Sequence, residues 1–522
     1  MSEQEVTESQ QDINQATTQD STTAPILTPI TSNQRISALD ILRGFALIGI
    51  LFMNIEWFSR PIAEISSFNN ELTGLDHAVG WLIRCFVEGK FYKLFALLFG
   101  MGFAVMLTQA MRKDRPFGAW FTRRMLVLFA FGLAHMFFLW QGDILHDYAA
   151  AGLILLGIIY LLRKKRFEKF NNPNSILKIA IWWLCIPMLL ASFAGIGLGV
   201  FVDRQSAVEN YKESQEINNL VMQLEADAEQ NKSLLSETLE VVQETTELVI
   251  EEATNSELEP SLSTVSEGEQ IVTEEADTEE QTPQQQAQEI FEFRQDASKR
   301  SIKEVKALQE GNYWEATEFR IAASLIFLAF TPFFALTMLV PIFLLGYWLV
   351  VTGVIKNHTQ HPKLFGNMAR IGFGLGLFVT VGGLTIMGHP AAERVMPFQA
   401  VGNLLFTLGQ FFMAAGYLGI VVRLLDSERW HKILAKLAPM GRMALTNYIM
   451  HSVILTSIFY GYAGGLYGEI SRAPQMLIVL AIVVVQIVLS GLWLKHFQYG
   501  PLEWVWRSLT YKKRQPFKVI TE

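Results

Sequence analysis

The sequence predicts an all-α, polytopic helical membrane protein with about ten transmembrane helices. Of its 522 residues, 51% are hydrophobic, and the mean hydropathy is +0.26. These values are typical of a chain that combines membrane helices with a sizeable polar portion. Apolar runs of about 20 residues, long enough for a helix to cross a bilayer, recur along the chain. We expect spans at residues 38–58, 91–111, 117–140, 143–162, 175–201, 333–355, 363–387, 399–425, 440–462 and 472–494.

Two segments decide the number of spans. Residues 319–355 form an apolar stretch that contains Pro332 and Pro341 and is long enough for two spans. Two spans there would move every later basic loop to the other side of the membrane, so we expect one span preceded by an interfacial helix. Segment 75–89 is amphipathic and too short to cross after Gly74, which predicts an interfacial or re-entrant position.

Lys and Arg residues predict the orientation, because cytoplasmic loops are enriched in them. They gather after the second, fourth, sixth and eighth expected spans and again near the end of the chain. Every second loop is therefore basic, which predicts that both the N- and C-termini lie in the cytoplasm. The residues concerned are Arg112, Lys113, Arg115, Arg123, Arg124, Arg163, Lys164, Lys165, Arg166, Lys169, Lys356, Lys363, Arg429, Lys432, Lys436, Lys512, Lys513 and Arg514.

Composition divides the chain into four parts. Residues 1–34 are rich in Ser, Thr and Gln and predict a disordered cytoplasmic tail. Residues 35–202 and 313–522 form the two halves of the membrane bundle, with five expected spans each. Residues 203–312 form an acidic insert that we expect to be largely disordered and periplasmic. Within it, segment 209–289 holds 22 of the 50 acidic residues. The remainder is basic, which suits a membrane core with basic loops rather than nucleic-acid binding.

Common catalytic and metal-binding motifs are missing from the sequence. There is no HExxH, Walker loop, GxSxG or dinucleotide fingerprint in a credible context. Cys85 and Cys185 lie in apolar runs without metal-ligand spacing, so no metal site is predicted. The glycine-rich run GFGLGLFVTVGG in the seventh expected span predicts close helix packing.

The first expected span carries polar groups at both ends. Asp40 and Arg43 lie near one end, and Asn54 and Glu56 near the other. Arg43 and Asn54 are eleven residues apart and share a helix face. Ionisable groups at membrane depth are costly and usually face the bundle interior or a polar cavity. Local roles stay open for two of them: Asp40 suits a helix start with Ser37, and Arg43 can snorkel to the headgroups.

Arginines gather in the predicted inner half of the bundle. Their forked guanidinium groups suit phosphate, so a phosphate-bearing donor would bind on that side. The predicted donor-binding residues are Arg43, Asp40, Arg124 and Arg442. Helix anchoring is the alternative explanation for arginines at this depth, and for Arg123 and Arg507 it is the preferred one. Asn447 and His451, at i and i+4, predict hydrogen bonds between helices. The residues assigned to structure and packing are Asn447, His451, Glu503 and Arg507.

Histidines and carboxylates gather in the predicted outer half. In QGDILHDYAAAG, the residues Asp143, His146 and Asp147 fall at i, i+3 and i+4 on one helix face. A carboxylate orients an imidazole and raises its basicity, which suits a general base. His135 lies one turn inside the third expected span and is the second candidate base. The alternative is a wet loop in which Asp143 caps the fourth helix.

Five longer motifs follow one another along the chain: LDILRGFALIGILFMN, EGKFYKLFALLFGMGF, GDILHDYA, GRMALTNYIMHS and GPLEWVWRSLTY. Together they resemble the YeiB family of bacterial inner-membrane proteins, whose domain is catalogued as a domain of unknown function, number 418. The resemblance covers nearly the whole chain except the tail and the acidic insert, and implies a multi-pass protein of the bacterial inner membrane with a C-terminal family domain.

The YeiB family is similar to a wider group that includes acyltransferase-3 proteins and heparan-glucosaminide acetyltransferases. Those enzymes move an acyl group from a cytoplasmic donor, often acetyl-CoA, to an acceptor on the far side. In acyltransferase-3 proteins an arginine in the first span is followed, after ten residues, by a histidine. Arg43 matches that arginine, but Asn54 stands at the histidine position, closer to the heparan-glucosaminide relatives. With the His and Asp residues identified above from their spacing, the predicted catalytic residues are His146, His135, Asp143, Asp147 and Asn54.

The resemblance and the split polar groups predict a transmembrane O- or N-acyltransferase. It would use acyl-CoA as a co-substrate, without a tightly bound cofactor, and a small-molecule or glycan acceptor. The expected partners are the lipid bilayer and that acceptor, with no nucleic acid and an open oligomeric state. Two alternatives remain: a small-molecule transporter or exporter, in which the same charges line a pathway, or a non-catalytic membrane scaffold.

Overall fold

The structure is a computed structural model. It describes residues 37–62, 65, 73–114, 116–164, 166, 172–200, 216–217, 219–228, 230–233, 282–389 and 396–519. The predicted disordered tail, residues 1–34, lies outside the described residues. Residues 234–281 of the acidic insert also lie outside them. The chain separates into two compact units, one of Met1–Gly199 with Glu304–Glu522 and one of Val200–Lys303. The first unit contains the membrane helices.

The predicted all-α, polytopic fold is confirmed. Apart from one isolated bridge between Phe497 and Lys518, the described secondary structure is helical. Nine helices or helical runs among the described residues are long and apolar enough to cross a membrane, and the shorter α19 (Ala444–Phe459) is also apolar. The long ones are α2 (Ser37–Ser59), α4 with α5 (Gly74–Phe86, Lys90–Arg112), α6 (Gly118–Phe138), α7 (Leu145–Leu162), α8 (Pro173–Val200), α11 with α12 (Tyr313–Phe334, Val340–Val351), α13 with α14 (Pro362–Asn367, Phe373–Met387), α16 (Met396–Leu425) and α20 (Arg472–His496).

Helices α11 and α12 form one run from Tyr313 to Val351, so the region that could have held two spans holds one. A capping box starts it: Asn312 accepts from the backbone of Trp314 at 2.9 Å, and Glu315 accepts from the Asn312 backbone at 2.8 Å. A π-helical turn at Ala335–Leu339 lies between its two prolines, where missing N–H groups disturb the regular hydrogen bonds. The segment predicted to form a separate helix before this span is instead continuous with it, because α11 runs through the π-helical turn into α12.

The predicted ninth span, 440–462, divides into two helices, α18 (Ala438–Arg442) and α19. The break is at Met443, whose φ of −104° and ψ of 34° are not helical. The carboxylate of Glu503 on α21 (Pro501–Tyr511) accepts from the Thr446 backbone at 3.0 Å. It thereby satisfies one of the donors left open at the start of α19. The break leaves Arg442 at the end of a short helix, beside the cavity described below.

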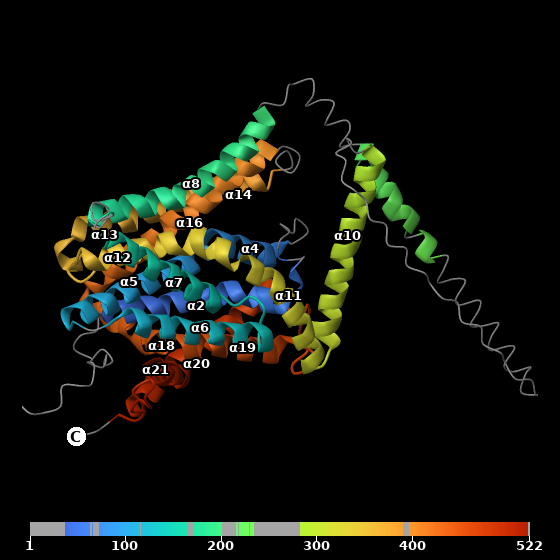
Figure 1. Ribbon diagram of the computed structural model, residues 1–522. Helices are drawn as coiled ribbons and strands as arrows, with labels where there is room; N and C mark the ends of the chain where they lie inside the picture. Colours follow the sequence, from blue (N-terminus) through green and yellow to red (C-terminus); the bar gives the residue numbers. More distant parts are fainter. Residues whose placement is uncertain are drawn as a thin grey trace, which may run out of the picture. The chain divides into compact units, whose positions relative to one another are not determined.

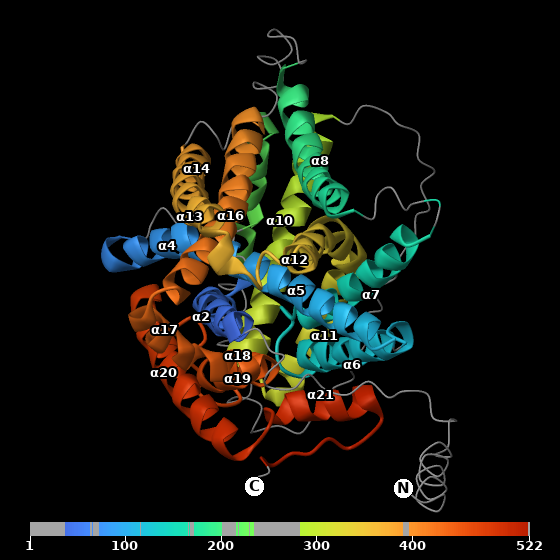
Figure 2. The same ribbon diagram turned by 90° about the vertical axis from the view of Figure 1, so that its left-hand side faces the viewer.

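Helix α2 is central in the bundle and packs against α5, α18, α19 and α20 (Figure 2). Elsewhere glycines let helices touch at the backbone. A Cβ on Gly346 of α12 would lie 2.1 Å from the Leu97 carbonyl of α5. In α14, a Cβ on Gly383 would lie 2.6 Å from the Phe406 backbone of α16. The close packing predicted from the glycine-rich run is therefore confirmed.

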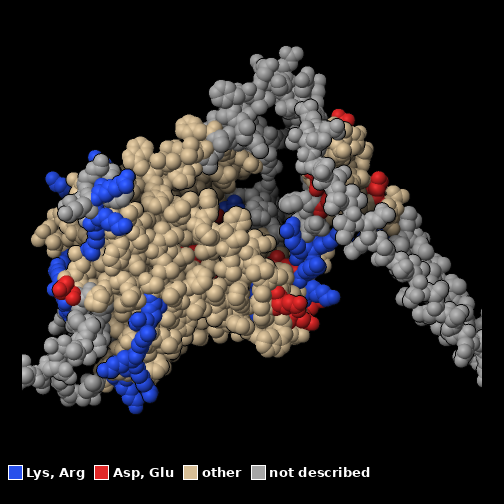
Figure 3. All heavy atoms as spheres, viewed as in Figure 1, with Lys and Arg blue, Asp and Glu red and all other residues tan. Residues whose placement is uncertain are grey.

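One end of the bundle is basic. Helix α5 ends at Arg112, and α7 ends at Leu162, just before Arg163 and Lys164. These ends lie on the same side of the bundle, at the left of Figure 1. Lys and Arg gather on that side in Figure 3. This is the end that the sequence predicts to face the cytoplasm.

The α5–α12 contact makes a stability prediction. Replacing Gly346 with Ala should destabilise the protein by about 1–3 kcal/mol, because the added methyl group overpacks a backbone contact. Gly374 on α14 has open space around its Cβ position, so Gly374→Ala should be neutral or stabilising through helix propensity. Thermal unfolding of both variants in one detergent measures the difference. Equal melting temperatures would show that α5 and α12 are not in backbone contact.

Candidate active site

A cavity of about 250 Å³ lies among α2, α5, α6, α7, α19 and α21. We call it the arginine cavity, because four arginines line it. All four predicted donor-binding residues are among its walls. Glu503 and Arg507, which the sequence assigned to packing, line it as well. The polar lining residues are Asp40, Arg43, Arg124, Gln498, Arg442, Glu503 and Arg507, and the apolar ones include Leu47, Phe95, Phe99, Leu128, Ile144, Leu145, Tyr148 and Tyr448.

The arginines are held in place by different partners. Arg43 donates to Asp40 on the same helix at 2.9 Å. The Arg124 guanidinium lies 3.6 Å from the ring centre of Trp506, and the Trp506 indole donates to the Arg124 carbonyl at 2.9 Å. Arg507 lies 4.6 Å from the ring centre of Tyr499. An aromatic face fixes a guanidinium without using its N–H groups. The buried Nε of Arg124 has no hydrogen-bond partner among the described residues.

The charge of the cavity lining is unbalanced. Four guanidinium groups face only two carboxylates, Asp40 and Glu503. Burial raises the pKa of Glu503, although hydrogen bonds from Thr446 oppose the shift. The lining therefore favours an anionic guest with several acceptor oxygens.

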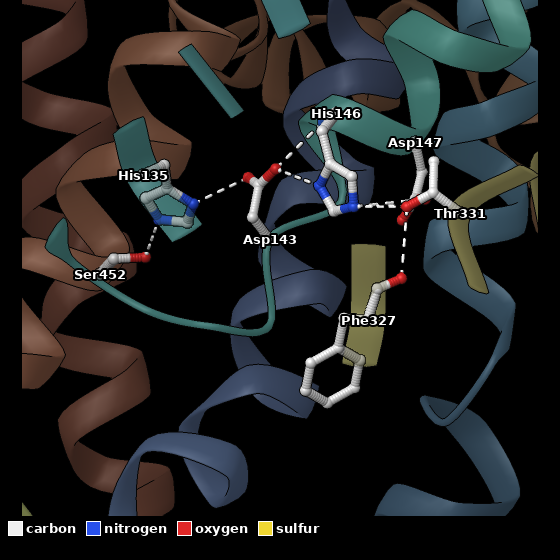
Figure 4. A network of polar contacts seen from close by, with 7 residues as sticks. All are labelled: His135, Asp143, His146, Asp147, Phe327, Thr331 and Ser452. Carbon is white, nitrogen blue, oxygen red and sulfur yellow. Dashed lines mark hydrogen bonds and ion pairs between the residues drawn. The ribbon is translucent and has the colours of Figure 1, made fainter. Parts of the chain in front are cut away.

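A second group of polar residues surrounds Asp143, and we call it the His–Asp cluster (Figure 4). It contains His135, Asp143, His146, Asp147, Thr331 and Ser452, all of them buried. Asp143 Oδ1 lies 2.7 Å from His135 Nδ1, and its Oδ2 lies 3.0 Å from His146 Nδ1. The opposite nitrogens of the two rings face hydroxyls. His135 Nε2 lies 2.7 Å from Ser452 Oγ, and His146 Nε2 lies 2.9 Å from Thr331 Oγ1.

The chain brings this cluster together through a tight turn. His135 is in the last turn of α6, and His146 is in the first turn of α7. The turn packs directly on α6, where a Cβ on Gly132 would lie 2.4 Å from the His146 nitrogen. Asp143 also accepts from the His146 backbone at 3.0 Å. Asp143 therefore accepts from the first turn of α7, as the capping alternative predicted, but it lies in a buried turn rather than a wet loop and also contacts both imidazoles.

Asp143 determines which ring nitrogen of His135 and of His146 carries a proton. Burial alone would raise its pKa, but hydrogen bonds from His135 and His146 outweigh burial and hold the pKa below its ordinary value of 3.8. The carboxylate is therefore ionised at neutral pH and accepts a proton-bearing Nδ1 from each ring. In a neutral His135, Nε2 is then an acceptor, and Ser452 is the donor that faces it.

The cluster borders the arginine cavity. Ile144 and Leu145, which follow Asp143 directly, line the cavity, and so does Tyr448 of α19. The Tyr448 ring lies 5.2 Å from the His135 ring, centre to centre. One layer of side chains thus separates the cavity from the His–Asp cluster. Across the described residues, no group of His, Cys, Asp and Glu has the arrangement of a metal site.

Asn54 is not part of the His–Asp cluster. It is half-buried on α2 and lines neither the arginine cavity nor the second one described below, and its side chain makes no hydrogen bond with a described residue. Its neighbour Glu56 pairs with Arg472 at 3.1 Å. These two residues, with Arg84 and Glu88, line a second cavity of about 200 Å³, near the opposite end of α2 from Arg43.

Asn447 and His451 bond to α20, as expected for helix packing. Asn447 Nδ2 donates to Ser490 Oγ at 3.0 Å, and His451 Nε2 lies 2.7 Å from Gln486 Oε1. His451 therefore faces away from the His–Asp cluster. The next residue, Ser452, is rotated by about 100° around the helix and faces the cluster.

Sequence reasoning missed three residues of this region: Ser452, Thr331 and Tyr448. Ser452 and Tyr448 both lie in the motif GRMALTNYIMHS, in which only the asparagine and histidine drew attention. The spacing of 445, 448 and 452 on one helix face was a usable signal. Thr331 had none, because it comes from α11, nearly two hundred residues after His146.

Comparison with known proteins identifies a family whose model matches part of the chain. Residues 349–513 match the model of a family described as "Protein of unknown function (DUF418)". The C-terminal part of the chain therefore contains the domain of this family. The matched part includes α19 and α21, which supply Tyr448, Ser452, Glu503 and Arg507. The other half of the site comes from the preceding helices.

Relatives align along nearly the whole chain. "Uncharacterized protein YxaH" of Bacillus subtilis is 28% identical, over 95% of this chain and 99% of the relative. "Uncharacterized protein YeiB" of Escherichia coli is 23% identical, over 92% of this chain and 98% of the relative. "Uncharacterized 39.9 kDa protein in amylase 3'region" of Bacillus acidopullulyticus is 24% identical, over 95% and 99%. No solved structure matches. These names state no activity, so the resemblance to acyltransferases stays a prediction.

The His–Asp cluster makes a prediction for stability. Asp143→Asn should lower the free energy of unfolding by about 3 kcal/mol, because it removes a buried ionised acceptor. The pKa of Asp143 is depressed in the folded protein, so its contribution is present at neutral pH and is lost as pH falls through that pKa, below 3.8. Thermal unfolding of both proteins at pH 7 measures the effect.

The matched control is Asp426→Asn, which removes a partly exposed ion pair with Arg423. It should cost at most about 1 kcal/mol. If the two variants melt together, Asp143 does not carry the ionised, doubly bonded carboxylate described here.

Proposed function

We propose that the protein is a membrane acyltransferase that takes an acyl group from a coenzyme A thioester. The phosphates of the donor bind the arginines of the cavity, and its thioester reaches the wall next to the His–Asp cluster. The acceptor is an alcohol or amine that approaches from the opposite side of the membrane. The proposed setting is the bacterial inner membrane, with the arginine end in the cytoplasm.

One observation carries the proposal: the same cavity is bordered by four arginines and by the neighbours of a buried His–Asp cluster. Such a cavity suits a long donor with phosphates at one end and a reactive carbonyl at the other. The apolar walls between them, including Phe95, Phe99 and Leu128, suit the uncharged middle of the donor. The unpartnered Nε of Arg124 offers a buried donor to a phosphate oxygen.

The chemistry follows from the protonation state. Ionised Asp143 holds a proton on Nδ1 of His135, so that Nε2 can accept a proton from an attacking hydroxyl or amine. The imidazolium formed in this step is stabilised by the same carboxylate. His146 shares Asp143 and lies 3.4 Å from Asp147, which fits a role in holding the carboxylate in place.

A transporter is the second candidate, and the cavity bordered by Glu56, Arg84, Glu88 and Arg472 favours it. Two polar cavities near opposite ends of α2 are the arrangement that an alternating-access pathway needs. Uptake of a substrate into liposomes without any acyl donor would support this reading. Acyl transfer without uptake would exclude it.

Donor binding provides the test of the acyltransferase proposal. Arg43→Lys should weaken acetyl-CoA binding by about tenfold, because lysine keeps the charge but loses the forked geometry. Arg423→Lys is the control, since Arg423 pairs with Asp426 away from the cavity. Calorimetric titration of protein in nanodiscs measures both affinities. No binding of acetyl-CoA or longer acyl-CoA to the unmodified protein would end the proposal.

Acyl transfer and donor binding should depend on different residues. His135→Gln should leave donor affinity unchanged and lower transfer by about 100- to 10,000-fold, as expected for loss of a general base. His451→Gln is the matched control, because His451 bonds to Gln486 instead. Transfer of labelled acetyl groups into envelope material, at equal protein levels, measures both. Equal transfer by the His135 and His451 variants would remove His135 from the reaction.

A further inference from the structure

We propose that Ser452 is a nucleophile that carries the acyl group as a serine ester between donor and acceptor. Ser452, His135 and Asp143 form a hydroxyl–imidazole–carboxylate chain with two contacts of 2.7 Å. The same chain activates serine in enzymes of unrelated folds, so it is recognised by geometry rather than by fold. The role of Ser452 in transfer rests on the proposed function, whereas its activation by His135 does not.

The hydrogen bonding of Ser452 is unusual for a serine inside a membrane helix. Serine and threonine in such helices commonly donate to the carbonyl one turn earlier. Several hydroxyls of this protein do so, namely those of Thr108, Ser192, Ser324, Thr337, Thr352, Thr385 and Ser457. Among the described residues, Ser452 Oγ has a single partner, Nε2 of His135. Its proton is therefore directed at the one acceptor that can remove it.

Thr331, the hydroxyl next to His146, differs in this respect. It donates to the Phe327 carbonyl at 3.3 Å, so its proton is already engaged with the backbone. The His146 ring has a carboxylate at each nitrogen, because Asp143 lies 3.0 Å from Nδ1 and Asp147 lies 3.4 Å from Nε2, the nitrogen that also faces Thr331. His146 is thus suited to positioning Asp143, and His135 is suited to activating the hydroxyl of Ser452.

Ser452 lies on the helix face that lines the arginine cavity. Ala444, Leu445 and Tyr448 line the cavity, and Ser452 follows Tyr448 by one turn on the same face. The Tyr448 ring lines the cavity and lies 5.2 Å from the His135 ring, centre to centre, so we place it between the cavity and Ser452. A thioester carbonyl therefore reaches Ser452 when this ring turns aside. The acyl group enters from the arginine end, and the acceptor meets the ester at the His–Asp cluster.

The proposed transfer balances in two steps. Ser452 Oγ bonds to the thioester carbonyl carbon while its proton passes to His135 Nε2. The carbon–sulfur bond then breaks, and the leaving thiolate takes that proton. In the second step the acceptor hydroxyl or amine attacks the serine ester and gives its proton to His135 Nε2. The proton returns to Ser452 Oγ as the ester bond breaks.

The first experiment uses a fluorophosphonate probe, which labels activated serines without needing the acyl donor. The full-length protein in nanodiscs should be labelled at Ser452, as located by peptide mass spectrometry. Labelling should disappear in Ser452→Ala and fall at least 100-fold in His135→Gln. Ser457→Ala, which changes a back-bonded serine on the same helix, should label normally. Absence of label on Ser452 in the unmodified protein overturns the proposal, whether or not transfer occurs.

The second experiment follows the acyl group from labelled acetyl-CoA in the absence of acceptor. We expect an acetyl mass on Ser452 that alkaline hydroxylamine removes. Ser452→Cys guards against loss of folding, because it should retain a thioester-bound acetyl group that neutral hydroxylamine removes. If Ser452→Ala transfers acyl groups as fast as the unmodified protein, the proposal of a serine ester is overturned, but the proposed acyltransferase function stands. If fluorophosphonate labels Ser452 but the protein binds no acyl-CoA, Ser452 is an activated serine and the proposal of an acyl-CoA donor is overturned.

Discussion

The site depends on the buried, ionised carboxylate of Asp143. An isolated carboxylate would be costly to bury, but this one accepts from two imidazoles and from the His146 backbone. Those bonds hold its pKa low and fix which ring nitrogen of His135 carries the proton. Without that charge, nothing would direct Nε2 of His135 toward Ser452 as an acceptor. The same bonds also fix the turn between α6 and α7.

The site also depends on the arginine cavity, one wall of which borders the His–Asp cluster around Asp143. Helices α2, α6, α18 and α21 supply its guanidinium groups, while α7 and α19 supply the wall next to the cluster. The break at Met443 places Arg442 at the cavity, and Glu503 both stabilises the start of α19 and lines the cavity. Helix packing and site geometry therefore depend on the same few residues, Glu503 above all.

Much of this arrangement could be predicted from the sequence, because its signals are local. Long apolar runs give the spans, and the i, i+3, i+4 spacing groups Asp143 with His146 and Asp147. Arg43 was recognised because an arginine at membrane depth needs a polar environment. Contacts between distant segments could not be predicted. Helical rotation alone decides that Ser452 rather than His451 faces His135, and that Asn54 turns away from the cluster. Packing also makes Arg507 part of the cavity, although its sequence context suggested an anchor.

The central claim is that one donor spans the arginine cavity up to the His–Asp cluster. The most direct measurement is a cryo-electron microscopy structure, in lipid nanodiscs, with a thioether analogue of acetyl-CoA that cannot transfer its acyl group. The account predicts phosphate density against Arg43, Arg124 and Arg442, with the thioether beside Tyr448 and its carbonyl directed at Ser452. An analogue bound at the cavity of Glu56 and Arg472, or an arginine cavity left empty at saturating analogue, would contradict it.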